Sequence, residues 1–153
     1  MAKGLTNSYV EKLSKKILKN INFKGVYPCD IHPKIKNNIF SVIFNTGDSQ
    51  SHGEHFVAIY ANEKNLFYFD SFGENIYDVN IKKFISNVIN SRKLIINTNK
   101  IQDDGSTFCG FFCIAFLLSK EKRVKYFKNI FKKDNLMKNN DIAVNFIIKF
   151  IQN

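Results

Sequence analysis

The segment QDDGSTFC, which runs from Gln102 to Cys109, joins a carboxamide to a thiol through a short polar loop. Gly110 and an apolar run follow the thiol directly, so Cys109 is predicted to open a helix. A thiolate at such a place is stabilised by exposed amide N–H groups and by the positive end of the helix dipole. These residue types, in this order, suit nucleophilic attack on a carbonyl carbon.

A candidate base and a candidate orienting acid lie upstream of this segment. His55 begins one predicted strand and Asp70 ends the next, with a symmetric turn about Glu63 and Lys64 between them. In that register Asp70 falls opposite Val57, so His55 and Asp70 are diagonal neighbours on one face, with about 7–8 Å between their backbones. The carboxylate can then hold one imidazole nitrogen and leave the other to the thiol.

Each residue of this set has a defined task in thiol chemistry. His55 would accept the thiol proton and return it to the leaving amine, and Asp70 would hold the imidazole tautomer and stabilise its cation. The side-chain amide of Gln102 and the backbone N–H of Cys109 are the natural donors to the oxyanion. Gly110 keeps side-chain bulk away from the substrate carbonyl.

Taken alone, each of these residues has an ordinary structural explanation. A cysteine before Gly-Phe-Phe is usually a core residue, a histidine at a strand start is often at the surface, and an aspartate before Ser-Phe-Gly can cap a turn. Their combination and order favour catalysis. His52, three residues before His55 in a polar loop, is the rival base, whereas His32 lies beside Pro33 in another loop.

The remaining pattern predicts the elements that must position these residues. Ser8 and Glu11 form a capping box before a helix that runs to about Asn20, and residues 22–37, with both prolines of the chain, are predicted to be an extended connection. Further elements are predicted as strands at Ile39 to Phe44 and Leu94 to Asn97, and as helices after Asp78, from Cys109, at Arg123 to Phe131 and at Ile142 to Ile151. This is an α+β layout, a small mixed or antiparallel sheet flanked by helices, in a single domain of residues 1–153.

Composition and charge narrow the classes of protein. Apolar residues make up 44% of the 153 residues, which argues against disorder, and no signal peptide or membrane span is expected because the most apolar stretch, 108–118, is shorter than the about 20 residues of a span. Lys and Arg number 23 against 13 Asp and Glu, giving a formal charge of +10. This charge fits either a lysine-rich solubilising surface or a nucleic-acid footprint, with seven cations crowded into residues 120–133.

The three cysteines indicate a reducing compartment rather than a disulfide framework. Cys109 and Cys113 lie one helical turn apart without the flanking ligands of a zinc site, so no metal is expected. Cys113 is predicted to pack within its helix, and Cys29 has no catalytic neighbour.

Three segments of the chain resemble the adenovirus protease (adenain) family and, more distantly, the proteases that process ubiquitin-like modifiers. They are NTGDSQSHGEHFVAIY, FYFDSFG and QDDGSTFCGFFC, in the His, acid, Gln, Cys order of the family. The resemblance covers roughly residues 39–118 and implies an adenain-like fold, in which a helix-borne cysteine faces a sheet-borne histidine and acid, as in papain-like enzymes. It implies His55, Asp70 and Cys109 as catalytic residues and Gln102 at the oxyanion hole.

The resemblance also implies a role and a substrate class. It implies a viral cysteine endopeptidase that matures capsid or core precursor proteins in the virion and host cell interior, by cleavage beside glycine or other small residues. Phe56 stands where the family has a tryptophan and, with Gly110, is expected to shape the substrate cleft. Asp70 replaces a glutamate of the adenovirus enzymes. We expect a monomer that needs no cofactor for the chemistry itself.

The family's activators and two competing functions complete the expectations. Adenovirus enzymes are activated by DNA, which the charge of this chain would allow, and by a disulfide-linked peptide, for which residues 90–101 contain no cysteine. An isopeptidase that removes ubiquitin or a similar modifier would use the same cleft chemistry. A basic nucleic-acid-binding domain, in which histidine, aspartate and cysteine are incidental, is the non-enzymatic alternative.

Overall fold

A computed structural model describes residues 6–46 and 55–151 of the chain. Four α-helices, five strands and two short 3₁₀ helices make up this part. In chain order they are α1 (Asn7–Ile17), β1 (Phe23–Pro28), β2 (Phe40–Asn45), β3 (Phe56–Ala61), β4 (Asn65–Phe69), α2 (Val79–Val88), β5 (Lys93–Ile96), α3 (Cys109–Glu121), η1 (Phe127–Ile130), η2 (Leu136–Lys138) and α4 (Asn139–Ile151). The predicted α+β class is confirmed.

The five strands form one mixed sheet in the order β1-β2-β3-β4-β5. The outer pairs β1–β2 and β4–β5 are parallel, and the central pairs are antiparallel. Ala61 pairs with Leu66 across the β3–β4 hairpin, which confirms the predicted register. The same register brings the residues just outside the two strands, His55 and Asp70, to one end of the sheet.

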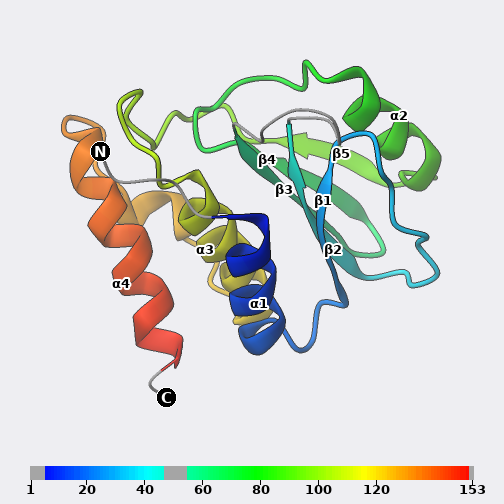
Figure 1. The fold of residues 1–153 in the computed structure, drawn as a ribbon, viewed down its shortest axis with the longest axis horizontal. Helices are drawn as coiled ribbons and strands as arrows, with labels where there is room; N and C mark the ends of the chain where they lie inside the picture. The colour runs from blue at the N-terminus through cyan, green and yellow to red at the C-terminus, as the bar shows by residue number, and fades with distance from the viewer. Residues whose placement is uncertain (1–5, 47–54, 152–153) are drawn as a thin grey trace.

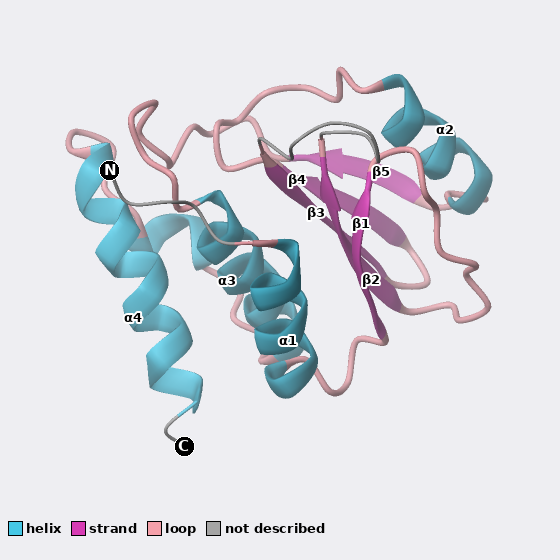
Figure 2. Cartoon of the chain, viewed as in Figure 1, coloured by secondary structure: helices cyan, strands magenta, loops and turns pink. Residues whose placement is uncertain are grey.

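Helices cover both faces of the sheet, but unequally (Figures 1 and 2). The helices α1, α3 and α4 lie on one face, and α2 lies on the other. Alternate residues of β3 divide accordingly: Phe56 and Ala58 join the core around α3, whereas Val57 and Ile59 join the core under α2. Ten of the thirteen residues of α3 are buried, so this apolar helix lies between the sheet and α4.

Two predictions about the N-terminal part of the chain are wrong. The cap of α1 is Thr6, whose hydroxyl accepts from Tyr9 N, and not Ser8; Glu11 instead accepts a hydrogen bond from Val26 N. Val26 is part of β1, a strand that lies within the predicted extended connection. This strand forms because it pairs with β2, which comes later in the chain.

The predicted basic helix at Arg123 to Phe131 is also wrong. Arg123 has φ 56°, in the left-handed region that ends an α-helix, and only the short 3₁₀ helix η1 forms within this range. The last helix starts at Asn139, three residues earlier than predicted. In the part of the chain that is described, no helix has the length and apolar character to cross a membrane.

Candidate active site

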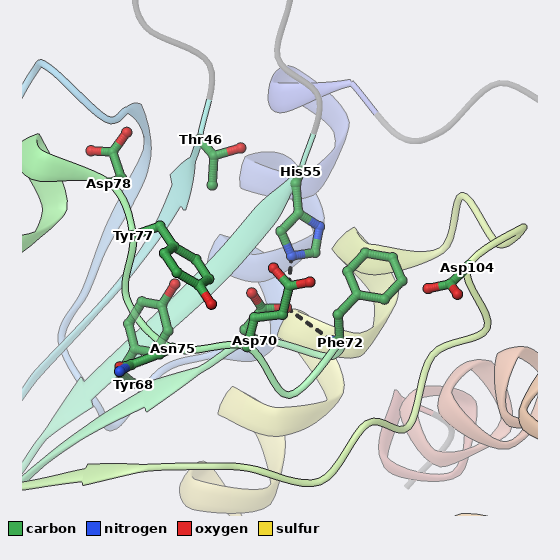
Figure 3. Close-up of a pocket in the computed structure, with 10 residues that line it drawn as sticks. Thr46, His55, Tyr68, Asp70, Phe72, Asn75, Tyr77, Asp78 and Asp104 are labelled. Carbon is green, nitrogen blue, oxygen red and sulfur yellow. Dashed lines mark hydrogen bonds and ion pairs between the residues drawn. The ribbon is translucent and has the colours of Figure 1, made fainter.

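The predicted site residues meet where β3 and β4 end and α3 begins. His55 immediately precedes β3, Asp70 immediately follows β4, and Cys109 is the first residue of α3. Figure 3 shows the imidazole of His55 pointing at the carboxylate of Asp70. Three segments that are far apart in the sequence therefore supply one cluster of titratable groups.

The imidazole and the carboxylate are directly bonded. Nε2 of His55 lies 2.8 Å from Oδ1 of Asp70, and both side chains are largely buried. The same oxygen accepts the backbone N–H of Phe72 at 2.8 Å, shown as the second dashed line in Figure 3. Since Nε2 is occupied, Nδ1 is the nitrogen left for the thiol.

Two neighbours hold this pair in place. Asn97, just after β5, brackets the backbone of Asp70: its Oδ1 accepts from Asp70 N and its Nδ2 donates to Asp70 O, both at 2.9 Å. The ring of Phe72 packs on the imidazole of His55, with 4.9 Å between the ring centroids. Neither the acid nor the base can rotate freely in this arrangement.

The surroundings of His55 favour its cationic form. Burial, the largest single influence, lowers the pKa of His55, but hydrogen bonds to Asp70 and then to Cys109, together with the charges of both, raise it from 6.5 to about 9. The imidazole is thus coupled to both partners, as a base between an acid and a thiol must be. At neutral pH this favours an imidazolium.

Cys109 lies at the start of α3, and the residue as a whole is 8% exposed. The helix cap, Phe108, supplies no side-chain hydrogen bond; its backbone N–H donates instead to the hydroxyl of Ser106 at 3.1 Å. A thiolate beside an imidazolium and a helix start is the arrangement that activates sulfur as a nucleophile. The site can therefore attack an acyl carbon.

Gln102 is completely buried beside the loop that leads to α3. Its Oε1 accepts from the hydroxyl of Ser71, and its Nε2 donates to Ser106 O at 3.1 Å and Ser106 Oγ at 3.2 Å. Ser106 in turn donates to Asn140 of α4. The amide is thus oriented by Ser71 after β4 and by Ser106 in the loop before α3, and Ser106 is itself held by α4.

A cavity of about 530 Å³ opens beside the base and the acid. Figure 3 shows its lining, which includes Tyr68 and Tyr77 and the carboxylates of Asp78 and Asp104 in addition to His55 and Asp70. This volume lies within the range of cavities that bind a small ligand or part of a peptide.

The remaining candidates from the sequence can also be placed. Phe56, next to His55, is 5% exposed in the core against α3, and Gly110, next to Cys109, is buried in the first turn of that helix; like Cys109 and Gln102, neither lines the cavity beside His55. His32 bonds the carbonyl of Cys29, away from the site. His52, the rival base, lies outside the described residues.

The other two cysteines are buried and do not line the cavity, and their pKa values differ from that of an exposed thiol. Cys113 is completely buried, as predicted for a helix packing residue, and burial, then the charges of Cys109 and Asp70, raises its pKa well above 9.0. Burial, then a hydrogen bond to Asp78, raises the pKa of Cys29 to about 11. Among the described residues, no group of three or more His, Cys, Asp or Glu side chains could hold a metal ion.

Sequence reasoning missed four residues of this site: Ser71, Phe72, Asn97 and Ser106. Two of them had a visible signal, because Ser71 and Phe72 directly follow the acid in the turn that ends the second hairpin strand. Asn97 and Ser106 carry no comparable signal, since isolated Asn and Ser residues in loops are common.

Comparisons with known proteins give a family and a similar fold. A family model described as adenovirus endoprotease matches residues 23–147. Comparison with the curated proteins finds no match. Among solved structures, the fold is similar to that of the Se-Met ASFV pS273R protease, with a TM-score of 0.59 and 17% sequence identity over 94% of this chain and 68% of that chain. At this identity the likeness concerns the fold.

Proposed function

The chain belongs to the adenovirus endoprotease family and is a cysteine endopeptidase, and we propose that Cys109, His55 and Asp70 perform its chemistry. The observation that carries this proposal is the 2.8 Å hydrogen bond between His55 and Asp70, with Cys109 close enough to raise the pKa of His55. A non-catalytic nucleic-acid-binding domain is not what the family match supports.

The proposed reaction proceeds through an acyl-enzyme. The thiol of Cys109 gives its proton to Nδ1 of His55, and the thiolate attacks the substrate carbonyl carbon. The tetrahedral intermediate collapses when the imidazolium protonates the leaving amine, which leaves a thioester on Cys109. Water then gives a proton to His55 and attacks the thioester, and the acid product departs with restoration of the thiol.

Two donors are proposed for the oxyanion. The backbone N–H of Cys109 is one, because the first N–H groups of a helix have no intrahelical partner. The side-chain amide of Gln102 is the other: its Nε2 donates to two oxygens of Ser106 in the free protein, so we propose that one of these N–H groups turns to the oxyanion when substrate binds. An oxyanion donor is worth about 100- to 1,000-fold in rate.

Selective alkylation tests the proposed nucleophile. At neutral pH iodoacetamide should label Cys109 faster than Cys29 and Cys113, which are more deeply buried and have a raised pKa, and His55→Ala should slow that labelling. Peptide mapping by mass spectrometry measures all three sites in one sample. Equal labelling of the three cysteines, or labelling of Cys109 that ignores the His55 substitution, would contradict the assignment.

We further propose that the substrates are viral capsid or core precursor proteins, cut beside glycine or other small residues, inside the infected cell or the virion. The family membership supports this choice. Incubation with virion precursor proteins, followed by mass spectrometry of the new termini, tests it. Rapid hydrolysis of ubiquitin-like modifier conjugates, with the precursors left intact, would point to an isopeptidase.

We also propose that duplex DNA raises the turnover rate, a proposal supported by the formal charge of +10. Addition of duplex DNA at low salt should increase the rate, and added salt should reverse the gain. A rate that is the same with and without DNA at low salt would remove DNA from the mechanism.

A further inference from the structure

A second cavity, of about 630 Å³, lies between the end of α3, the segment after it and the sheet at β4 and β5, and Cys109, His55 and Asp70 are not part of its lining. The strands contribute Tyr60, Phe67 and Ile95, and the segment after α3 contributes Tyr126 and its neighbours. No step of the proposed peptide hydrolysis uses this cavity.

Its charge is one-sided. The lining includes the cations Lys120, Arg123, Lys125 and Lys128 and no aspartate or glutamate. The salt bridges found in the described part of the chain are Lys15–Glu11, His55–Asp70 and Lys100–Asp104, so none of these four cations is neutralised by a carboxylate there. Four unpaired cations around one concave surface favour an anionic ligand.

The environment of Lys120, which lines the cavity, also favours binding of an anion. Its ammonium lies 3.8 Å from the ring centroid of Phe67 and 5.4 Å from that of Phe116. Burial, and then the charge of Lys128, lower the pKa of Lys120. An anion bound beside this ammonium would offset both effects.

The cavity walls are aromatic as well as cationic. Tyr60 and Phe67 are stacked with 5.9 Å between centroids, and Tyr126, which also lines the cavity, is 66% exposed. An exposed ring of this kind can stack on a flat heterocycle, and the amides of Asn62 and Asn129 supply hydrogen-bonding groups nearby. The volume exceeds what a simple inorganic anion needs and falls within the range for small organic ligands.

We propose that this cavity binds a nucleoside polyphosphate, with the base stacked on Tyr126 and the phosphates held by Lys120, Arg123, Lys125 and Lys128. Such a ligand offers the cavity an unstacked base together with phosphate groups. A DNA duplex keeps its bases stacked within the double helix, so it could present only phosphates to a concave site. The two proposals share cations of residues 120–133, and they differ in the free base, which a nucleotide presents to Tyr126 and a duplex does not.

Calorimetric titration of the purified chain with ATP, inorganic triphosphate and adenosine tests the site. ATP should bind at least about tenfold more tightly than triphosphate or adenosine, because only ATP engages both the ring and the cations. Equal affinities for ATP and triphosphate would overturn the proposal, as would stronger competition by duplex DNA than by ATP at equal phosphate concentration.

Matched variants locate the binding. Lys125→Ala/Lys128→Ala should weaken ATP binding at least about tenfold. The control Lys82→Ala/Lys83→Ala removes the same charge from the exposed face of α2, outside the cavity, and should leave the affinity unchanged. An equal loss in both double variants would show a general charge effect and overturn the site.

The stacking step has its own test. Tyr126→Ala should reduce the affinity for ATP to that for triphosphate, without changing the affinity for triphosphate, and Tyr126→Phe should keep the preference for ATP. Tyr126 is exposed, so both variants should fold, which circular dichroism checks. An ATP preference that survives Tyr126→Ala would overturn the assignment of the base to this ring.

Discussion

The imidazole of His55 connects the acid to the nucleophile, so its proton decides what the site can do. It bonds Asp70 through Nε2, and Cys109 is close enough to raise its pKa. Because the carboxylate also accepts the N–H of Phe72, its position is set by backbone as well as by side chains. The proposed chemistry therefore depends on the side chains of Cys109, His55 and Asp70, and substituting each one in turn tests its role.

Removal of the nucleophile or of the base should abolish cleavage while the fold persists. Cys109→Ala and His55→Ala should each lower kcat/KM about 10,000-fold or more, because each removes a step that nothing replaces. Cys113→Ala, one helical turn further into the core, should keep its turnover. Peptide hydrolysis measured beside circular dichroism checks all three, and an active Cys109→Ala variant would refute the mechanism.

The pH profile should report His55. The active form holds the imidazolium that protonates the leaving amine, and this proton is lost as the pH rises through about 9. We therefore expect kcat/KM to decline on the alkaline side with a midpoint near pH 9. Asp70→Asn should move that midpoint to lower pH, because the carboxylate raises the pKa of His55.

Glu74→Gln is the control for that shift, because Glu74 lines the same cavity but is not among the groups that raise the pKa of His55; its profile should keep the wild-type midpoint. The same proton bears on stability. Since the pKa of His55 is raised on folding, its contribution to the free energy of unfolding is complete below about pH 6.5 and is lost through about pH 9. Urea unfolding of wild type and His55→Asn across this range measures the difference.

Gln102 should act on turnover more than on binding. Gln102→Ala should lower kcat about 100- to 1,000-fold with a smaller change in KM, because an oxyanion donor acts mainly in the transition state. Steady-state kinetics on a peptide substrate separate the two constants. A variant with raised KM and unchanged kcat would place Gln102 in substrate binding instead.

At the scale of elements, two loops must meet for the site to form. One follows β4 and carries Asp70; the other precedes α3 and carries Gln102. The carbonyl of Ser71 in the first loop accepts the N–H groups of Ile101 and Gln102 in the second, at 2.9 and 3.1 Å. Their close approach depends on Gly73, whose φ is 71°.

Gly73→Ala should therefore disturb both loops. A Cβ there would lie 2.8–2.9 Å from backbone atoms of residues 98–100, in a backbone conformation that alanine rarely adopts. We expect the free energy of unfolding to fall by about 1–3 kcal/mol and kcat to fall with it. Gly105→Ala, whose Cβ would approach only a side-chain oxygen of Asp103 at 3.2 Å, should change stability by less than about 0.5 kcal/mol.

Denaturant melts of the two glycine variants provide the comparison. Equal stability of Gly73→Ala and Gly105→Ala would show that the two loops tolerate separation. The active site would then depend less on the contact between these two loops than the backbone distances indicate.

At the scale of the whole molecule, the sheet separates two apolar layers, and the site lies at one end of both. Phe69 and Phe116 stack at 4.5 Å in the layer beneath α3, and Phe84 of α2 packs at 5.0 Å from Phe44 in the other layer. The sheet is packed against both layers, the one under α3 that contains Cys109 and the one under α2 that does not. We expect the layers to unfold in a single cooperative transition.

The fold and the base–acid pair could be predicted largely from the sequence, because their determinants are local. The alternation in the hairpin set the register that brings His55 to Asp70, and Asp78 was visible as the residue before α2, which it caps. Such patterns act over a few residues, where side-chain period and turn geometry leave few alternatives.

Only the tertiary structure decided the rest. Strand β1 exists because β2, many residues later, pairs with it, and the helix predicted after α3 yields to a left-handed Arg123. The bonds of Asn97 to Asp70 and of Ser106 to Gln102 join loops whose proximity depends on the whole sheet and on α4. A polar residue in a loop carries no periodic signal, because its partner is chosen by packing and not by neighbours in the chain.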